Sequence, residues 1–148
     1  EIARRIHEKE NLTIMTNAIP IAVDLTNKSN VNVMLTGGTL RNESYSLVGP
    51  DAEEVIRNYY FDKLFLGVDG IDIELGLTTP NPMEAQLNRL MVERASEVIA
   101  VTDSSKFGRQ SFSFICGLEV ISTIITDTKL SEEYEKKLLN QDINVIKV

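Results

Sequence analysis

Short apolar runs and stretches of helical spacing alternate along the chain. Each run has the length of one buried strand, because strands in soluble proteins usually bury four to eight residues at roughly this spacing. The runs lie at Leu12–Thr16, Val31–Leu35 and residues 44–48, 64–68, 97–102, 120–126 and 143–148. The pattern therefore predicts strands at regular intervals along the chain.

Between the strands, apolar residues recur at the spacing of amphipathic helices. The pattern predicts helices over residues 2–9, after Asn17, from Pro50, from Pro82 and after Ser131. Asn17 and Ser131 have side chains that cap a helix, and proline is favoured in a first turn. The predicted buried faces include Ile19, Ala22, Val23 and Thr26 in the second helix and Ala52, Val55, Ile56 and Tyr59 in the third.

Strands that alternate with helices predict a single layered α/β domain over residues 1–148, with a mainly parallel sheet flanked by helices. Such domains usually begin with a strand, so we expect a further strand and its loop upstream of Glu1. Right-handed crossovers place the loops after parallel strands at one sheet edge, where ligands bind. These loops are residues 16–17, 36–41, 69–70 and 103–108, and Asp127.

Composition and charge narrow the functional classes. The 148 residues are 43% hydrophobic and 25% charged, with a net charge of −7 and a pI of about 4.8. An acidic surface repels phosphate backbones, so nucleic acid is expected to bind only through another domain. No apolar run approaches the roughly 18 residues of a membrane span, and no signal-peptide pattern opens the chain. We expect a cytoplasmic protein.

Two glycines and an arginine follow the second predicted strand. Gly37 and Gly38 allow the backbone to approach a ligand closely, and Arg41 offers a planar cation suited to phosphate. A glycine hairpin beside a solvated arginine explains the same residues equally well. The segment matches neither the dinucleotide-binding fingerprint nor a Walker-type phosphate loop.

Five further positions carry groups that each have two interpretations. Asp69 could accept sugar hydroxyls or satisfy its own turn, and the hydroxyls of Thr78 and Thr79 could hold polar oxygens or form turns. Glu84, in the first turn of its helix, could interact favourably with the helix dipole or act as a carboxylate base. Lys106 could meet a phosphate as a point charge or lie free on the surface.

Histidine and cysteine are scarce. His7, on the predicted N-terminal helix, is the only histidine, which argues against a histidine triad or metal cluster. Cys116 is the only cysteine, so no intramolecular disulfide forms, and the residue is expected to be a small buried apolar group. We expect no metal and no cofactor.

Five segments carry a family resemblance when taken in order. They read Thr-Asn-Ala-Ile-Pro at 16–20, Leu-Thr-Gly-Gly-Thr-Leu-Arg at 35–41, Gly-Val-Asp-Gly at 67–70, Gly-Leu-Thr-Thr-Pro at 76–80 with Glu84 following, and Asp-Ser-Ser-Lys-Phe-Gly at 103–108. Together they resemble the C-terminal effector domain of DeoR-type bacterial transcription regulators of sugar metabolism. The resemblance covers nearly the whole chain.

The resemblance implies a fold shared with ribose-phosphate isomerases and CoA-transferases, a phosphorylated sugar as effector, and an upstream winged helix-turn-helix domain as the only DNA contact. It also implies an upstream strand with a Gly-Thr-Thr loop, which is absent from this sequence. Asn88 departs from the family, which often has lysine one turn after the glutamate matching Glu84. The departure puts in doubt one ligand contact or any residual isomerase chemistry.

By resemblance, the effector-binding residues are expected to be Thr16, Asn17, Gly37, Gly38, Arg41, Asp69, Gly70, Thr79, Glu84 and Lys106. The favoured hypothesis is a non-enzymatic sensor, part of a repressor that forms a homo-oligomer, either a dimer or a tetramer. The alternative is a sugar-phosphate isomerase on the same fold, with Glu84 or Asp69 as base and Lys106 as electrostatic stabiliser. A third interpretation is an oligomerisation module that binds no sugar phosphate.

Overall fold

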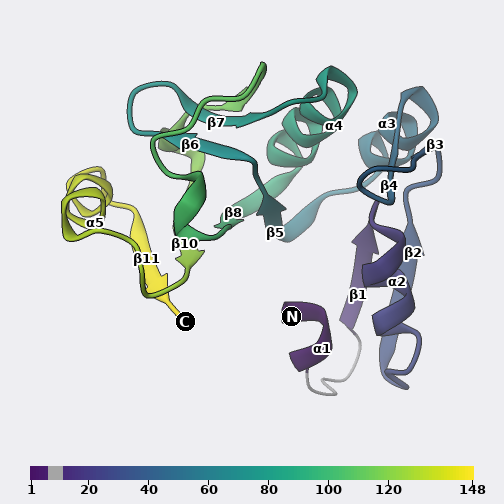
Figure 1. The fold of residues 1–148 in the computed structure, drawn as a ribbon. Coiled ribbons are helices and arrows are strands. Elements are labelled where there is room, and N and C mark those ends of the chain that lie inside the picture. The colour runs from purple at the N-terminus through teal and green to yellow at the C-terminus, as the bar shows by residue number, and fades with distance from the viewer. Residues whose placement is uncertain (7–11) are drawn as a thin grey trace. The chain divides into compact units, whose positions relative to one another are not determined.

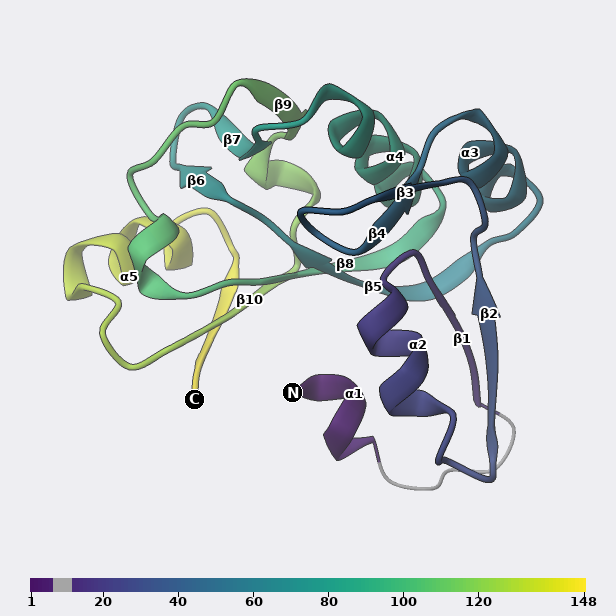
Figure 2. The same ribbon diagram turned by 45° about the vertical axis from the view of Figure 1, so that its right-hand side comes forward.

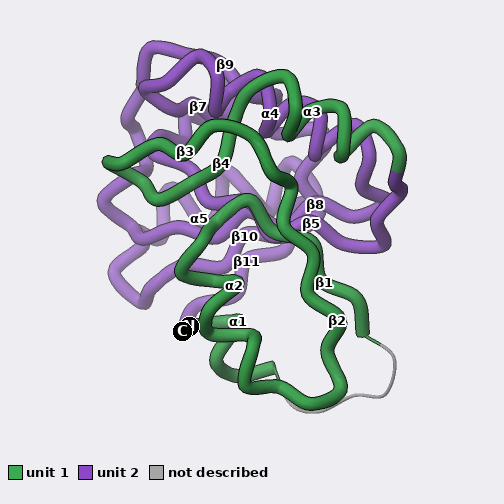
Figure 3. The backbone as a smooth tube through the Cα atoms, turned by 90° about the vertical axis from the view of Figure 1, so that its right-hand side faces the viewer, with its two compact units in different colours: residues 1–58 green, residues 59–148 purple. Residues whose placement is uncertain are grey.

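The computed structural model describes residues 1–6 and 12–148. Its backbone forms two compact units, residues 1–58 and residues 59–148 (Figures 1 and 3). The first element is the short helix α1 (Ile2–Arg5), so the predicted helix over 2–9 is confirmed for its first residues and otherwise falls outside the described ones. His7 also lies outside them.

The first unit is built on two parallel strands. β1 (Leu12–Thr16) pairs in register with β2 (Val31–Leu35), and α2 (Ile19–Leu25) connects them. An antiparallel hairpin of β3 (Thr39–Arg41) and β4 (Ser46–Val48) follows, and then α3 (Pro50–Arg57). β3 had no counterpart in the predicted elements, because its three residues are too few to produce a periodic pattern.

Two predicted roles in the first unit are wrong. Asn17 does not cap α2: the N-cap is Ala18, and the Asn17 side-chain amide instead donates to the Leu47 carbonyl at 3.3 Å. Tyr59 does not extend the buried face of α3, which ends at Arg57 and buries Ala52 and Ile56. In both cases a tertiary contact or an early helix end overrides the local pattern. Two further residues that were predicted to be buried, Val23 and Thr26 at α2, are exposed, and the helix buries Ala22 and Leu25 instead.

The second unit contains a four-stranded parallel sheet in the order β11-β10-β8-β5. Its strands are β5 (Phe61–Gly67), β8 (Ala95–Val101), β10 (Thr123–Thr126) and β11 (Asn144–Lys147). The helix α4 (Pro82–Glu93) precedes β8, and α5 (Glu132–Leu139) joins β10 to β11. The α/β class with a parallel sheet and flanking helices is therefore confirmed.

A small antiparallel sheet in this unit includes residues between Asp69 and Pro82, where the pattern predicted no strand. β6 (Gly70–Asp72), β7 (Gly76–Thr79) and β9 (Ser113–Cys116) pair in the order β6-β7-β9. Figure 2 shows β7 and β9 beside α4, and the helix contacts both strands. Residues 76–81 did not stand out as a strand because two of the four β7 residues are threonines. All four β7 residues are nevertheless buried.

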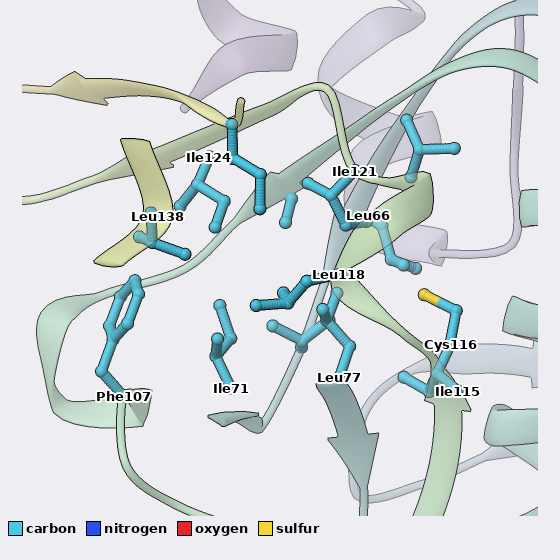
Figure 4. Packing of buried hydrophobic residues seen from close by; sticks show 14 of the residues in the cluster. Leu66, Ile71, Leu77, Phe107, Ile115, Cys116, Leu118, Ile121, Ile124 and Leu138 are labelled. Carbon is cyan, nitrogen blue, oxygen red and sulfur yellow. The ribbon is translucent and has the colours of Figure 1, made fainter. Parts of the chain in front are cut away.

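The core of the second unit lies among these layers. Figure 4 shows Leu66 of β5, Ile71 of β6, Leu77 of β7 and Ile124 of β10 packed with Leu138 of α5. All five are almost fully buried, and burial of each such side chain stabilises the fold by about 1.5–3 kcal/mol. The core thus fixes the small sheet and α5 to the parallel sheet, so that the loops between them have defined positions.

Candidate functional site

The carboxyl ends of three parallel strands lie side by side in the second unit. Gly67 of β5 is level with Val101 of β8, and Val101 is level with Ile125 of β10. Asp69 and Asp127 follow the two outer strands of this set, and residues 103–106 follow the middle one. The predicted gathering of these loops at one sheet edge is confirmed within this unit.

Four of the predicted side chains form one cluster, which we call the carboxylate–lysine cluster: Asp69, Thr79, Glu84 and Lys106. The Thr79 hydroxyl lies 2.9 Å from Asp69 Oδ2 and 3.4 Å from Glu84 Oε2. Lys106 Nζ lies 4.0 Å from Asp69 Oδ1. Each member comes from a different element, so only the folded chain brings them together.

The cluster combines a buried hydroxyl with partly exposed charges. Thr79 is 2% exposed, whereas the side chains of Asp69 and Lys106 are 47% and 30% exposed. A solute can therefore reach the Lys106 ammonium group and the Asp69 carboxylate, and the buried Thr79 hydroxyl holds that carboxylate by a hydrogen bond. Carboxylates accept hydrogen bonds from hydroxyl groups, and an ammonium group binds anionic oxygens.

Glu84 reaches the cluster because α4 begins where the sequence predicts. Pro82 occupies the first turn, and the Asn81 side chain accepts hydrogen bonds from the amides of Met83 at 2.9 Å and Glu84 at 3.1 Å. This cap fixes the first turn, and with it the position of Glu84 beside Thr79. Asn88, one turn later, is half-buried.

The loop that carries Lys106 is held by two aspartates. The Asp103 carboxylate accepts a hydrogen bond from the Ser105 amide at 2.9 Å, and the hydrogen bonds from Ser105 lower the pKa of Asp103. Asp127 accepts the Ser104 amide at 2.7 Å and the Lys129 amide at 2.8 Å, and these bonds lower its pKa in turn. Both carboxylates are therefore ionised near neutral pH.

Gly70 serves packing at this edge. It is buried, and a Cβ atom there would lie 2.6 Å from both the Arg109 carbonyl oxygen and the Thr78 hydroxyl oxygen. Thr78 is also buried, and its hydroxyl accepts the Ser111 amide at 2.9 Å. Of the two neighbouring threonines, Thr79 belongs to the carboxylate–lysine cluster, whereas the Thr78 hydroxyl holds the backbone of Ser111.

The other five predicted residues form a second group in the first unit. Thr16 ends β1 and Asn17 follows it, and Gly37 and Gly38 follow β2. The Thr36 amide donates to the Thr16 carbonyl at 3.2 Å and links the ends of the two strands. Arg41, at the end of β3, donates to the Ser44 hydroxyl at 3.3 Å and the Glu43 carboxylate at 3.2 Å. The ten predicted residues thus form two groups, one in each unit.

The double glycine is required by backbone geometry. Gly37 has φ of 70° and Gly38 has φ of 99°, values that favour glycine. A Cβ at Gly38 would lie 2.5 Å from the Val48 carbonyl oxygen, whereas one at Gly37 would meet nothing within 4 Å. Gly38 therefore packs against β4, while Gly37 presents an open backbone.

Residues other than the predicted ten also shape the site. Asp103 and Asp127 were placed in the right loops by sequence, but their bonds to backbone amides were not predicted. An aspartate at a strand end, two residues before an amide that it can accept, is the signal that was available. Asp72 shows the same pattern, because it accepts the amides of Glu74 and Leu75, both at 2.9 Å, in the β6–β7 turn.

Other chemistries find little support in the part of the chain that the structure describes. Residues 1–6 and 12–148 contain no group of three histidine, cysteine, aspartate or glutamate side chains placed to hold a metal ion. Cys116 is buried, and burial raises the pKa of its thiol to about 11, so it is a thiol at neutral pH. Within the same residues, every helix is too short or too polar to cross a membrane.

The sequence of this chain is similar to those of several transcription regulators. GlpR, an HTH-type transcriptional regulator of Haloferax volcanii, is 41% identical over 99% of this chain and 57% of its own length. A putative aga operon transcriptional repressor of Escherichia coli O157:H7 is 43% identical over 100% of this chain and 55% of its own length. The transcriptional repressor AccR of Agrobacterium fabrum is 36% identical over 86% of this chain and 50% of its own length. The chain thus spans about half the length of these relatives.

The match to a family of domains is equally extensive. Residues 1–128 match the DeoR C terminal sensor domain, and this range includes all ten predicted site residues and both strand-end aspartates. The isomerase alternative, by contrast, finds no counterpart in the names of these three relatives, each of which is a regulator or repressor. The chain belongs to the family of DeoR C-terminal sensor domains.

Proposed function

We propose that this chain is the effector-binding part of a non-enzymatic transcription regulator, and that its effector is a phosphorylated sugar. The observation that carries the proposal is the carboxylate–lysine cluster, in which Thr79 lies 2.9 Å and 3.4 Å from two carboxylates and Lys106 lies 4.0 Å from one of them. Carboxylates accept sugar hydroxyls, and the lysine supplies a cation for a phosphate oxygen.

The first unit offers a second set of groups suited to a phosphate. Gly37 has an open backbone, and Arg41 is permanently charged. We propose that Thr16, Asn17, Gly37, Gly38 and Arg41 in this unit, and Gly70 in the second unit, also serve effector binding. The names of the relatives support regulation, and the fold supports a ligand at the carboxyl ends of parallel strands.

DNA binding is assigned to a segment that precedes Glu1. The net charge of −7 disfavours direct contact of this chain with a phosphate backbone. The relatives are DNA-associated by name, as HTH-type regulators or operon repressors, and they are about twice as long as this chain. A cytoplasmic homo-oligomer is the form of regulator that we propose, because effector binding must favour one arrangement of its parts to change DNA affinity.

A sugar-phosphate isomerase is the second candidate. One observation favours it: two carboxylates share the buried Thr79 hydroxyl, and a lysine lies beside one of them, and such groups can act as base and electrostatic stabiliser. The names of the relatives favour the sensor. Turnover of ribose 5-phosphate by the full-length protein would establish the enzyme and refute the non-enzymatic assignment.

The test of the sensor is a thermal-shift screen of sugar phosphates on the full-length protein, followed by titration calorimetry. A ligand at about 100 times its dissociation constant stabilises the folded state by about 2.7 kcal/mol. We expect at least one sugar phosphate to do so, and Lys106→Ala and Arg41→Ala to weaken its binding without unfolding the protein. A flat response to every sugar phosphate would refute the proposal and favour the oligomerisation module.

A further inference from the structure

Asp127 connects two loops at the carboxyl edge of the parallel sheet. It follows β10, and its two carboxylate oxygens accept different backbone amides: Oδ2 accepts Ser104 at 2.7 Å, and Oδ1 accepts Lys129 at 2.8 Å. Ser104 belongs to the loop after β8, so the first of these bonds crosses from one strand end to the next. Both oxygens are thus engaged by the protein backbone.

Ser104 is the first residue of the short 3-10 helix that ends at Lys106. The same loop is anchored on its other side, because the Gly108 amide donates to the Ile71 carbonyl at 2.8 Å and Phe107 forms a bridge with Ile71. Ile71 lies two residues after Asp69, so this second anchor fixes the loop to the chain that carries the partner of Lys106. From the β10 side, the Thr102 amide donates to the Ile125 carbonyl at 3.1 Å where the loop begins, and Asp127 holds the turn itself through Ser104.

A lysine side chain has many rotamers, so the place its ammonium group reaches depends on how firmly its backbone is held. We propose that Asp127 is a positioning residue, which holds the Ser104–Lys106 turn so that the Lys106 ammonium group faces Asp69 and the bound sugar phosphate. The inference rests on the proposed function. It assigns Asp127 a role in effector affinity that passes through Lys106.

The proposal separates Asp127 from a ligand-contacting residue. Asp127→Asn keeps the shape but replaces one acceptor oxygen with an NH2 group, which cannot accept a backbone amide. Ser104→Pro removes the same bond from the other side, because proline has no N–H. Proline suits this position, since it begins the turn and the preceding Asp103 is extended, with ψ of 160°.

The experiment is a double-mutant cycle on the full-length protein. The probe is whichever of ribose 5-phosphate, glucose 6-phosphate and fructose 6-phosphate binds the wild type most tightly in titration calorimetry. Lys106→Ala is expected to weaken binding about tenfold or more, the usual effect of losing a charged partner. Asp127→Asn and Ser104→Pro should each weaken binding about three- to tenfold in the wild-type background, and less than about twofold when Lys106 is already alanine.

The matched control is Asp72→Ala, which removes the oxygen Oδ1 that accepts both the Glu74 and the Leu75 amides in the β6–β7 turn. It should lower the melting temperature as Asp127→Asn does and leave the affinity unchanged. Equal, additive losses from Asp127→Asn in both backgrounds would overturn the inference, as would unchanged affinity in Asp127→Asn and Ser104→Pro. If the wild type binds none of the three probes, the sugar phosphate with the largest effect in the thermal-shift screen takes their place; a flat screen refutes the proposed function, and the inference fails with it.

Discussion

Thr78 and Thr79 are neighbours of the same residue type, almost fully buried, with different partners. The Thr79 hydroxyl donates to a carboxylate of the cluster at 2.9 Å, whereas the Thr78 hydroxyl accepts the Ser111 backbone amide at 2.9 Å. Thr→Val conserves the shape at either position and removes only the hydroxyl. The pair of variants therefore separates a site hydroxyl from a structural one.

The two variants should lose different amounts of folding stability, because the groups left without the threonine hydroxyl differ. In Thr79→Val, Asp69 loses a hydrogen bond, but its side chain is 47% exposed, so water replaces the lost donor and the cost is about 1 kcal/mol. In Thr78→Val, the half-buried backbone amide of Ser111, just before β9, loses its acceptor, which costs about 1–3 kcal/mol. For a chain of this size, 1 kcal/mol corresponds to about 2–4 °C in melting temperature.

Binding should rank the two variants in the opposite order. Thr79→Val releases Asp69 and Glu84 from their shared hydroxyl, so we expect sugar-phosphate affinity to fall about fivefold or more. Thr78→Val should leave affinity within about twofold of the wild type. Urea unfolding and titration calorimetry on the full-length protein measure the two effects.

The opposite outcome has a definite meaning. If Thr79→Val destabilises the protein as much as Thr78→Val and leaves affinity unchanged, the Thr79 hydroxyl is a structural group. The cluster would then hold its carboxylates without it, and the physical basis that we give for the site would be wrong.

Gly38→Ala should destabilise the protein by about 1–3 kcal/mol in urea unfolding, because φ of 99° and a contact of 2.5 Å with the Val48 carbonyl oxygen both oppose a Cβ; Gly37→Ala, with open space, should cost about 1 kcal/mol. The pKa of Asp127 and that of Asp103 are lowered from 3.8, so the stability they contribute is present above that pH and is lost as the pH falls through their lower folded values. Melting temperatures between pH 5 and pH 3 should therefore fall less steeply in Asp127→Asn than in the wild type, and parallel curves would contradict the assignment. Since the Cys116 thiol is buried with a pKa of about 11, its reaction with a disulfide reagent at pH 8 should be slow in the native protein and fast in urea; rapid native labelling would show that the site opens.

The main strands were predictable because their apolar runs are long and regular. β5, β8, β10 and β11 all overlap the predicted runs, and the handedness of crossovers then brings their loops to one edge. The approach of Asp69 to Lys106 follows from that rule. The position of Glu84 follows from Asn81 and Pro82, which set the start of α4.

The small sheet was not predictable by the same means. β7 contains two threonines that are buried because each finds a partner from another segment, and periodicity measures side-chain polarity without regard to such partners. Asn17 was expected to cap a helix because its local sequence allows it, but Leu47 of β4 takes its side chain. The Asp127 bond to Ser104 likewise joins residues 23 positions apart, a distance that no local pattern covers.

The contact between Gly70 and the backbone of Arg109 constrains how relatives of this domain diverge. Any side chain at position 70 would strike that carbonyl and the Thr78 hydroxyl, each 2.6 Å from a Cβ. The position therefore accepts another amino acid only when the segment around residue 109 is rebuilt at the same time. In a collection of such sequences, insertions and length changes near 109 should accompany every loss of glycine at 70.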